Sequence, residues 1–238
     1  MKRLVIVLAT IALVAVIGDV VLYRLARHFY TREAIVRLGP TGMPSFVETG
    51  PGTSPRVLML GDSRIWLWKD FATDQVHAFN AGVGNETTAQ ISLRAQDAIQ
   101  RVRPAVVVIE AGINDLKTIP LMPDAQKRIE DDCVNHIMGC VKLARESGAA
   151  VVVLSVLPAG KVEWSRWPVW SGAVAESVQT VNHRLEERCR GDGSVRFLDL
   201  TPEVQLKRDY VDALHFNAAF YDRISPLVLR AIQEALGK

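Results

Sequence analysis

The chain of 238 residues is long enough for one sizeable domain with an appendage, and its 49% apolar content suffices for a packed core. The formal net charge of +2, without a dense Lys/Arg block, predicts no nucleic-acid partner. The three cysteines are sparse and lack zinc-like spacing, so buried free thiols are favoured over a disulfide, and no metal or cofactor is predicted.

The first element in chain order is an apolar segment from Leu4 to Leu22, preceded by Lys2 and Arg3. As a helix it would span about 28 Å, close to the roughly 30 Å hydrocarbon thickness of a bilayer. We interpret residues 1–23 as an uncleaved transmembrane anchor. A cleavable signal peptide is the alternative, although no small-x-small cleavage site follows the apolar stretch.

Residues 24–55 are predicted to be a juxtamembrane linker, because their second half is rich in Gly, Pro, Ser and Thr and lacks periodicity. Arginines after the anchor outnumber the two basic residues before it, so the positive-inside rule leaves the side of the membrane open. We expect the folded domain, residues 56–238, to lie outside the cytoplasm.

From residue 56 onward, short apolar runs alternate with longer amphipathic stretches. Runs that are continuously apolar are typical of strands covered on both faces. The predicted strands lie at 57–60, 77–80, 105–112, 149–156 and 195–200, and the predicted helices at 88–102, 123–147, 173–190 and 218–236. This alternation predicts an α/β fold with a five-stranded parallel sheet between two helical layers.

Polar segments stand where these strands end or close to the last helix, at the edge of an open parallel sheet where binding sites form. They are GDS (61–63), AGVGNET (81–87), GIND (112–115) and DALH (212–215). Each segment alone is typical of a turn or a helix cap. Together they supply the side chains of a nucleophilic active site.

A serine hydroxyl becomes a good nucleophile when a histidine takes its proton and an aspartate holds that histidine in the correct tautomer. Ser63, His215 and Asp212 fit these roles, and the spacing of three lets Asp212 and His215 turn toward each other. Negative charge on the substrate oxygen needs donors, predicted to be the backbone N–H of Ser63, a backbone N–H in the 82–85 loop and the side-chain amide of Asn114.

The four segments resemble the sequence blocks of the SGNH hydrolases, also called GDSL-type esterases and lipases, over residues 57 to about 236. The resemblance implies a flavodoxin-like three-layer α/β/α fold and metal-free hydrolysis of esters, or acyl transfer. It implies Ser63 as nucleophile, Asn114 as oxyanion donor, and Asp212 with His215 as the other triad members.

One block departs from the family pattern. Family members commonly carry Asn-x-Gly-x-x-Gly, whereas NAGVGNET has Asn85 at the second glycine and Gly84 one position earlier. A backbone donor does not require glycine, and asparagine tolerates a left-handed backbone better than most residues. The donor from this loop is therefore either Asn85 or Gly84.

Two features bear on the substrate, an ester of a small molecule, lipid or carbohydrate. Trp164 and Trp167 lie in a long connection after the fourth strand, where they could wall an acyl or sugar pocket or simply attach the connection to the surface. Arg64 could contact an anionic substrate group or be an exposed arginine at a helix start.

The leading hypothesis is a serine esterase, held at a membrane, that cleaves an acyl or acetyl ester. The first alternative is an O-acetyl esterase or acyltransferase of envelope polysaccharide with the same catalytic residues. The second alternative is a non-catalytic binding module, which the departure at Asn85 alone supports.

Overall fold

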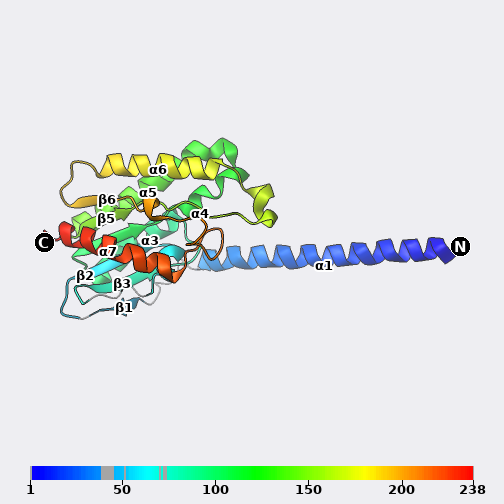
Figure 1. Cartoon of the computed structure of the whole chain (residues 1–238), viewed down its shortest axis with the longest axis horizontal. Coiled ribbons are helices and arrows are strands. Elements are labelled where there is room, and N and C mark those ends of the chain that lie inside the picture. The colour runs from blue at the N-terminus through cyan, green and yellow to red at the C-terminus, as the bar shows by residue number, and fades with distance from the viewer. Residues whose placement is uncertain (1, 39–45, 51, 70, 72–73, 238) are drawn as a thin grey trace. The chain divides into compact units, whose positions relative to one another are not determined.

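The computed structural model describes residues 2–38, 46–50, 52–69, 71 and 74–237 (Figure 1). The chain divides into two compact units, one ending at Gly42 and one beginning at Met43. The first unit consists of helix α1 (Lys2–Leu38), and the second, here called the catalytic unit, contains every other element.

Helix α1 is long and apolar enough over Lys2–Phe29 to cross a membrane, with a mean hydropathy of 2.8, although an N-terminal signal sequence meets the same criteria. The helix continues beyond residue 23 into the segment predicted to be a linker. Residues 24–38 contain neither Gly nor Pro, so nothing in their composition ends the helix before Gly39.

The catalytic unit is built on a sheet with the strand order β1-β3-β2-β4-β5-β6. Its strands are β1 (Val47–Thr49), β2 (Arg56–Gly61), β3 (His77–Gly82), β4 (Val106–Glu110), β5 (Ala150–Leu154) and β6 (Val195–Leu198). Strands β2 to β6 are mutually parallel in the flavodoxin-like order, which confirms the predicted fold class. Strand β1 adds a sixth, antiparallel member at the β3 edge.

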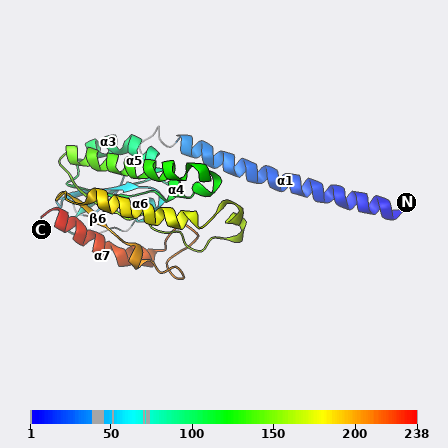
Figure 2. The ribbon, with the colours of Figure 1, turned by 90° about the horizontal axis from the view of Figure 1, so that it is seen from above.

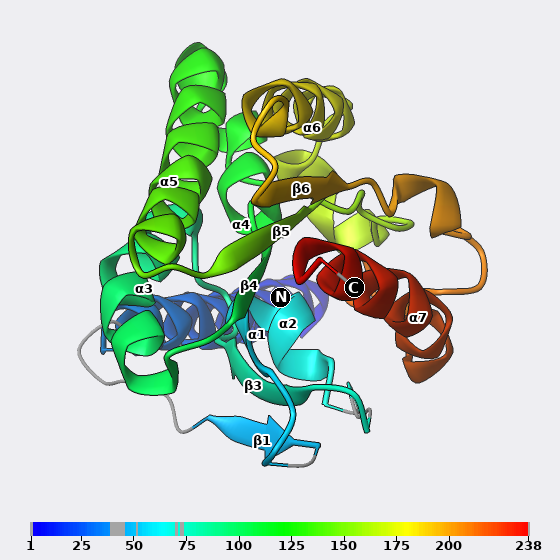
Figure 3. The same cartoon turned by 90° about the vertical axis from the view of Figure 1, so that its left-hand side faces the viewer.

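Helices cover both faces of the sheet (Figures 2 and 3). One face is covered by α3 (Thr88–Val102), α5 (Gln126–Glu146) and α6 (Ala173–Cys189), and the other by α2 (Ser63–Leu67) and α7 (Ala218–Ala235). Each face of the sheet has its own hydrophobic core, and alternate residues of a strand pack into one or the other. Leu58 packs toward α3 and α5, while Met59 packs toward α7. Because the strands are buried on both faces, their sequences are continuous apolar runs.

All three cysteines are buried free thiols, as predicted. Cys133 and Cys140 lie on the buried face of α5, and burial raises the pKa of Cys140 to about 12. Cys189 lies in the same core from α6, and burial raises its pKa to about 11. These thiols are therefore protonated packing groups at neutral pH.

Glycines allow close backbone contacts at the carboxyl edge of the sheet. A Cβ added to Gly61 would lie 2.1 Å from the carbonyl oxygen of Glu110, and one added to Gly82 would lie 2.1 Å from the backbone nitrogen of Trp66. Strand β3 can therefore approach helix α2 closely only because residue 82 has no side chain.

We predict that Gly82→Ala lowers the free energy of unfolding by about 1–3 kcal/mol, the usual cost of overpacking, because the new methyl group meets rigid backbone. Chemical denaturation followed by tryptophan fluorescence measures the loss. Gly172→Ala is the control, since a Cβ there meets no atom within 4 Å. Equal stability of the two variants would contradict the close approach.

Candidate active site

Ser63 stands at the junction between β2 and α2. Asp62 caps the helix by accepting a hydrogen bond from the backbone N–H of Arg64 at 2.9 Å, and Ser63 is the first helical residue. The Ser63 hydroxyl lies 3.0 Å from Nε2 of His215, which is 152 positions away in the chain. The fold thus brings together two residues that the sequence could only pair by chemical type.

Asp212 and His215 form a unit on the loop before α7. Oδ2 of Asp212 lies 2.7 Å from Nδ1 of His215, and Oδ1 accepts the backbone N–H groups of Leu214 at 2.7 Å and His215 at 2.9 Å. Burial raises the pKa of Asp212, but the hydrogen bonds from His215 and Leu214 outweigh it, so the pKa lies below its usual value. An ionised Asp212 favours a proton on Nδ1 and leaves Nε2 free to accept the Ser63 proton.

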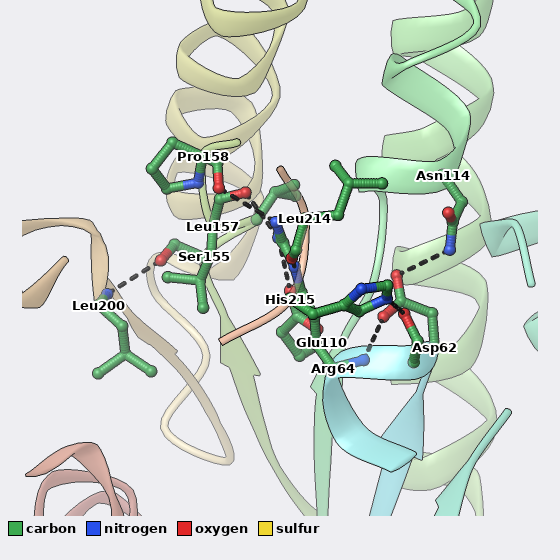
Figure 4. Close-up of polar contacts among 12 residues, drawn as sticks. Asp62, Arg64, Glu110, Asn114, Ser155, Leu157, Pro158, Leu200, Leu214 and His215 are labelled. Atoms are coloured by element: carbon green, nitrogen blue, oxygen red, sulfur yellow. Dashed lines mark hydrogen bonds and ion pairs between the residues drawn. The ribbon is translucent and has the colours of Figure 1, made fainter. Parts of the chain in front are cut away.

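Asn114 approaches the same point from α4 (Ile113–Leu116), directly after β4. Its Nδ2 donates to the carbonyl oxygen of Glu86 at 2.9 Å and to Oδ2 of Asp62 at 3.3 Å, the contact drawn in Figure 4. Its Oδ1 accepts from Nζ of Lys117 at 2.5 Å. The ammonium group of Lys117 therefore fixes which end of the amide faces Asp62.

The loop after β3 has the conformation that the departure from the family pattern requires. Asn85 has a φ of 65°, in the left-handed region that asparagine tolerates. The space around Gly84 is open, because a Cβ there would meet no atom within 4 Å. Both residues therefore remain candidates for the backbone donor.

Asn80 ties this loop to the helix that carries the nucleophile. Its Nδ2 donates to the carbonyl oxygens of Ile65 at 2.6 Å and Trp68 at 3.0 Å, and its Oδ1 accepts the N–H of Gly82 at 2.9 Å. Asn80 was not among the predicted site residues. The available signal was a polar amide inside the otherwise apolar strand HAFN.

The position of Arg64 corrects both interpretations drawn from the sequence. Its side chain is neither exposed nor open to substrate, since only 2% of the residue is accessible. Nε donates to the carbonyl oxygen of Leu214 at 3.1 Å, Nη1 to that of Leu157 at 2.6 Å and Nη2 to that of Pro158 at 3.0 Å (Figure 4). The guanidinium carbon also lies 5.1 Å from the centroid of the Phe216 ring. Arg64 thus contacts both neighbours of His215.

A buried acidic side chain lies beside this guanidinium, since Oε1 of Glu110 is 3.5 Å from Nη1 of Arg64. Asp62, also buried, bonds the backbone of Arg64 instead. Burial, with the charge of Asp62, raises the pKa of Glu110 to about 8 despite Arg64. Burial likewise raises the pKa of Asp62. The signal that could have marked Glu110 was an acidic residue ending an apolar strand.

A second buried ion pair supports the same edge of the sheet. Nη2 of Arg94 lies 2.7 Å from Oε2 of Glu86 and also donates to the carbonyl oxygen of Gly61 at 3.0 Å. Because the carbonyl of Glu86 accepts from Asn114, this pair connects the end of β2 to the oxyanion side of the site. Burial raises the pKa of Glu86, against the effect of Arg94.

Trp164 and Trp167 lie on the short helical segment η4 (Trp164–Val169) and are 79% and 69% exposed. No contact among the described residues joins either ring to Ser63 or His215. Trp170, by contrast, packs against the core.

No group of three His, Cys, Asp or Glu side chains that could hold a metal ion occurs in the described part of the chain, and the absence of a cofactor stays a prediction.

The sequence model of the GDSL-like Lipase/Acylhydrolase family matches residues 59–223, a span that contains Ser63, Asn114, Asp212 and His215. The chain belongs to this family. The family is named for ester cleavage, and membership makes this chain an enzyme that acts on ester bonds.

Solved structures share the fold. A GDSL-like lipase from Bacteroides thetaiotaomicron is 23% identical with a TM-score of 0.63, and the match covers 88% of this chain and 97% of that one. A carbohydrate acetylesterase from Sinorhizobium meliloti is 16% identical with a TM-score of 0.61, over 76% and 99% of the two chains. An aryl esterase from M. smegmatis is 16% identical with a TM-score of 0.59, over 76% and 100%. Among curated protein sequences, none matches the chain.

We predict that Arg64→Lys lowers kcat by about 10- to 100-fold, because one ammonium group cannot bond three diverging carbonyls and a displacement of about 1 Å can cost that much. KM should change little, since Arg64 does not face the substrate. Steady-state kinetics on a short chromogenic ester, with thermal unfolding in parallel, separates positioning from stability.

The matched control for this variant is Arg223→Lys. Arg223 also bonds a buried carboxylate, Asp209, and a backbone carbonyl, that of Glu203, and lies over the Phe220 ring, but it does not contact the triad. A wild-type kcat in Arg64→Lys would show that the hydrogen bonds of Arg64 do not align His215.

We predict that the free energy of unfolding falls as pH rises from about 4.5 to 8. In this window the unfolded chain releases the Glu110 proton while the folded chain keeps it, which gives a slope of up to about 1.4 kcal/mol per pH unit. Glu110→Gln should reduce this decline, to which the raised pKa values of Asp62 and Glu86 also contribute, and Glu146→Gln on the surface should retain it in full. Denaturant titrations across this pH range measure the slopes, and an unchanged slope in Glu110→Gln would rule out the raised pKa.

Proposed function

We propose that the chain is a serine esterase in which Ser63 attacks the carbonyl carbon of an acyl or acetyl ester, His215 acts as the base and Asp212 orients it. One observation carries this proposal: the continuous hydrogen-bonded series from the Ser63 hydroxyl to His215, at 3.0 Å, and from His215 to Asp212, at 2.7 Å. These are the lengths that proton transfer between such groups needs.

In the first step the Ser63 proton passes to Nε2 of His215 as the oxygen bonds to the substrate carbon. The resulting imidazolium is stabilised by the Asp212 carboxylate, and its proton then goes to the departing alcohol oxygen. A water molecule, activated by His215 in the same way, releases the acid from Ser63 and regenerates the free enzyme.

The oxyanion would be stabilised by the backbone N–H of Ser63, by Nδ2 of Asn114 and by a backbone N–H of the 84–85 loop. The substrate oxygen would take the place of Asp62 on Nδ2, because that contact, at 3.3 Å, is the longer of the two that Asn114 donates. Lys117 adds a positive charge on the far side of the amide. A lost donor of this kind typically costs about 100- to 1000-fold in rate.

A second candidate is the removal or transfer of O-acetyl groups on envelope polysaccharide. The shared fold with a carbohydrate acetylesterase supports it, as does the apolar N-terminal helix. Incubation with an acetylated oligosaccharide and an unacetylated acceptor distinguishes the two reactions. Free acetate alone would identify hydrolysis, and an acetylated acceptor would identify transfer.

For localisation, we propose that residues 1–23 anchor the chain in a membrane and that the catalytic unit acts outside the cytoplasm. The support is the apolar stretch of α1, which is 28 residues long. Within the described structure its side chains are exposed. Residues 24–55 would connect the anchor to the catalytic domain at 56–238. A mature protein that begins after the apolar stretch would identify a signal peptide instead.

We predict that Ser63→Ala lowers kcat for a short-chain chromogenic ester by about 10⁴- to 10⁶-fold, the range for loss of a serine nucleophile. Ser147→Ala, at the opposite edge of the sheet, should keep full activity. A fluorophosphonate probe should label the wild type and Ser147→Ala but not Ser63→Ala. Undiminished turnover in Ser63→Ala would reject the proposal, and failure of the folded wild type to be labelled would favour a binding module.

A further inference from the structure

The catalytic unit exposes its large apolar side chains at one edge. Those that are highly exposed among its described residues, here called the apolar rim, are Trp66, Leu93, Leu121, Met122, Trp164, Trp167, Val169, Leu206 and Val211. Each lies in a segment that follows the carboxyl end of a strand. The loops that lead into the strands at the opposite edge, such as 103–105, 147–149 and 190–194, carry none among the described residues.

Several members of the apolar rim lie close in the chain to the candidate catalytic residues. Trp66 follows Ser63 by three positions, and Leu121 belongs to the segment directly after the helix of Asn114. Leu206 and Val211 lie on the loop that ends at His215. Scattered apolar side chains are normal on a surface, but a one-sided set around a site marks a contact surface.

The composition of the rim is typical of a lipid interface. Tryptophans and basic residues are the side chains that bilayer interfaces favour, since their apolar parts enter the lipid while their polar ends stay in water. Lys161 and Arg166 flank Trp164, and the Lys69 ammonium lies 5.2 Å from the centroid of the Trp66 ring. Glu163 is the acidic neighbour within that segment.

The N-terminal helix supplies the reason to choose a bilayer as the partner. Residues 30–45 connect the apolar stretch Lys2–Phe29 to the catalytic unit. Even fully extended, such a connection reaches only about 55 Å, at about 3.4 Å per residue. A membrane that holds the helix is therefore present at high effective concentration, and a weak surface affinity suffices for docking.

We propose that the apolar rim docks on the surface of a lipid bilayer, so that the site around Ser63 opens toward the headgroups and takes an ester carried by the membrane. The choice of a membrane-borne ester rests on the proposed function, whereas the docking itself does not. A tether alone does not choose which face of the unit meets the lipid, and the rim is what selects that face.

The test uses the full chain reconstituted into vesicles of phosphatidylcholine and phosphatidylglycerol. Leu121→Cys places a label for a polarity-sensitive fluorophore on the rim, and Ser147→Cys places one at the opposite edge. The three native cysteines are buried and do not compete for the label. We expect emission at 121 to shift to the blue and to be quenched by lipids that carry a nitroxide, and emission at 147 to do neither.

In the Leu121→Cys background, Trp164→Glu with Trp167→Glu should reduce this quenching toward the level at 147, and so should Leu206→Glu with Val211→Glu, which alters a different segment. Equal quenching at 121 and 147, or quenching that neither pair reduces, overturns the proposal. Energy transfer between labels at 121 on separate chains, without lipid quenching, overturns it in favour of a second copy.

The quenching must persist in the Ser63→Ala background, because docking needs no nucleophile. Hydrolysis that survives Ser63→Ala would therefore refute the proposed catalytic role while leaving the docking result unaffected. Loss of docking with normal Ser63-dependent hydrolysis would refute the docking proposal and leave the proposed catalytic role unaffected.

Discussion

The site depends on one buried guanidinium. Arg64 follows the nucleophile directly and donates to carbonyls that lie 93, 94 and 150 positions away in the chain. A guanidinium can do this because its donors form a rigid planar fork and its charge persists when buried. The bond to Leu214 and the contact with the Phe216 ring tie the loop that carries His215 to α2, and the other two bonds tie α2 to the segment after β5. Arg64 therefore holds the residue before His215 close to the helix of Ser63, an alignment that the proposed proton transfer needs.

Such alignment requires charge to be placed in the interior. Removing ionisable groups from water is costly unless they are paired, and burial of this kind rarely adds stability by itself. Here Glu110 lies beside Arg64, Glu86 pairs with Arg94, and Asp62 is buried next to Ser63, all of them beneath the carboxyl edge of the sheet. The concentration of buried charge at the catalytic edge, between two otherwise apolar cores, indicates that stability is exchanged there for a preorganised site.

The same edge combines the catalytic residues with the most exposed apolar side chains of the unit. A parallel sheet explains the coincidence, because every connection that leaves a strand emerges at that edge and is free to vary in length and composition. The connections after β4, β5 and β6 contribute Asn114, Trp164 and His215 respectively. One structural rule thus brings the proposed triad, the proposed oxyanion donors and the proposed lipid-facing residues to one side.

The sequence by itself predicted the layered fold, which the structure confirms, and it proposed Ser63, Asp212 and His215 as a triad, whose side chains the structure brings within hydrogen-bonding distance. Continuous apolar runs require strands buried on both faces, and the three-residue spacing of Asp212 and His215 is a local property of the chain. Asparagine was expected only to tolerate a left-handed backbone at position 85, and the structure has that conformation there. Strand β1 was not predicted, because its three residues lie in a Gly- and Pro-rich segment that is too short and irregular to show a strand periodicity.

Only the tertiary structure decided what Arg64, Asn80 and Glu110 do. The partners of Arg64 are backbone carbonyls, which every residue possesses, so no pattern of side chains marks them in advance. A position at a helix start suggests an exposed residue, but Glu110 at the end of β4, the segment after β5 and the His215 loop contact Arg64 and bury it. The types of the reacting side chains can be read from the local sequence. The hydrogen bonds that align those side chains form between segments that come together only on folding.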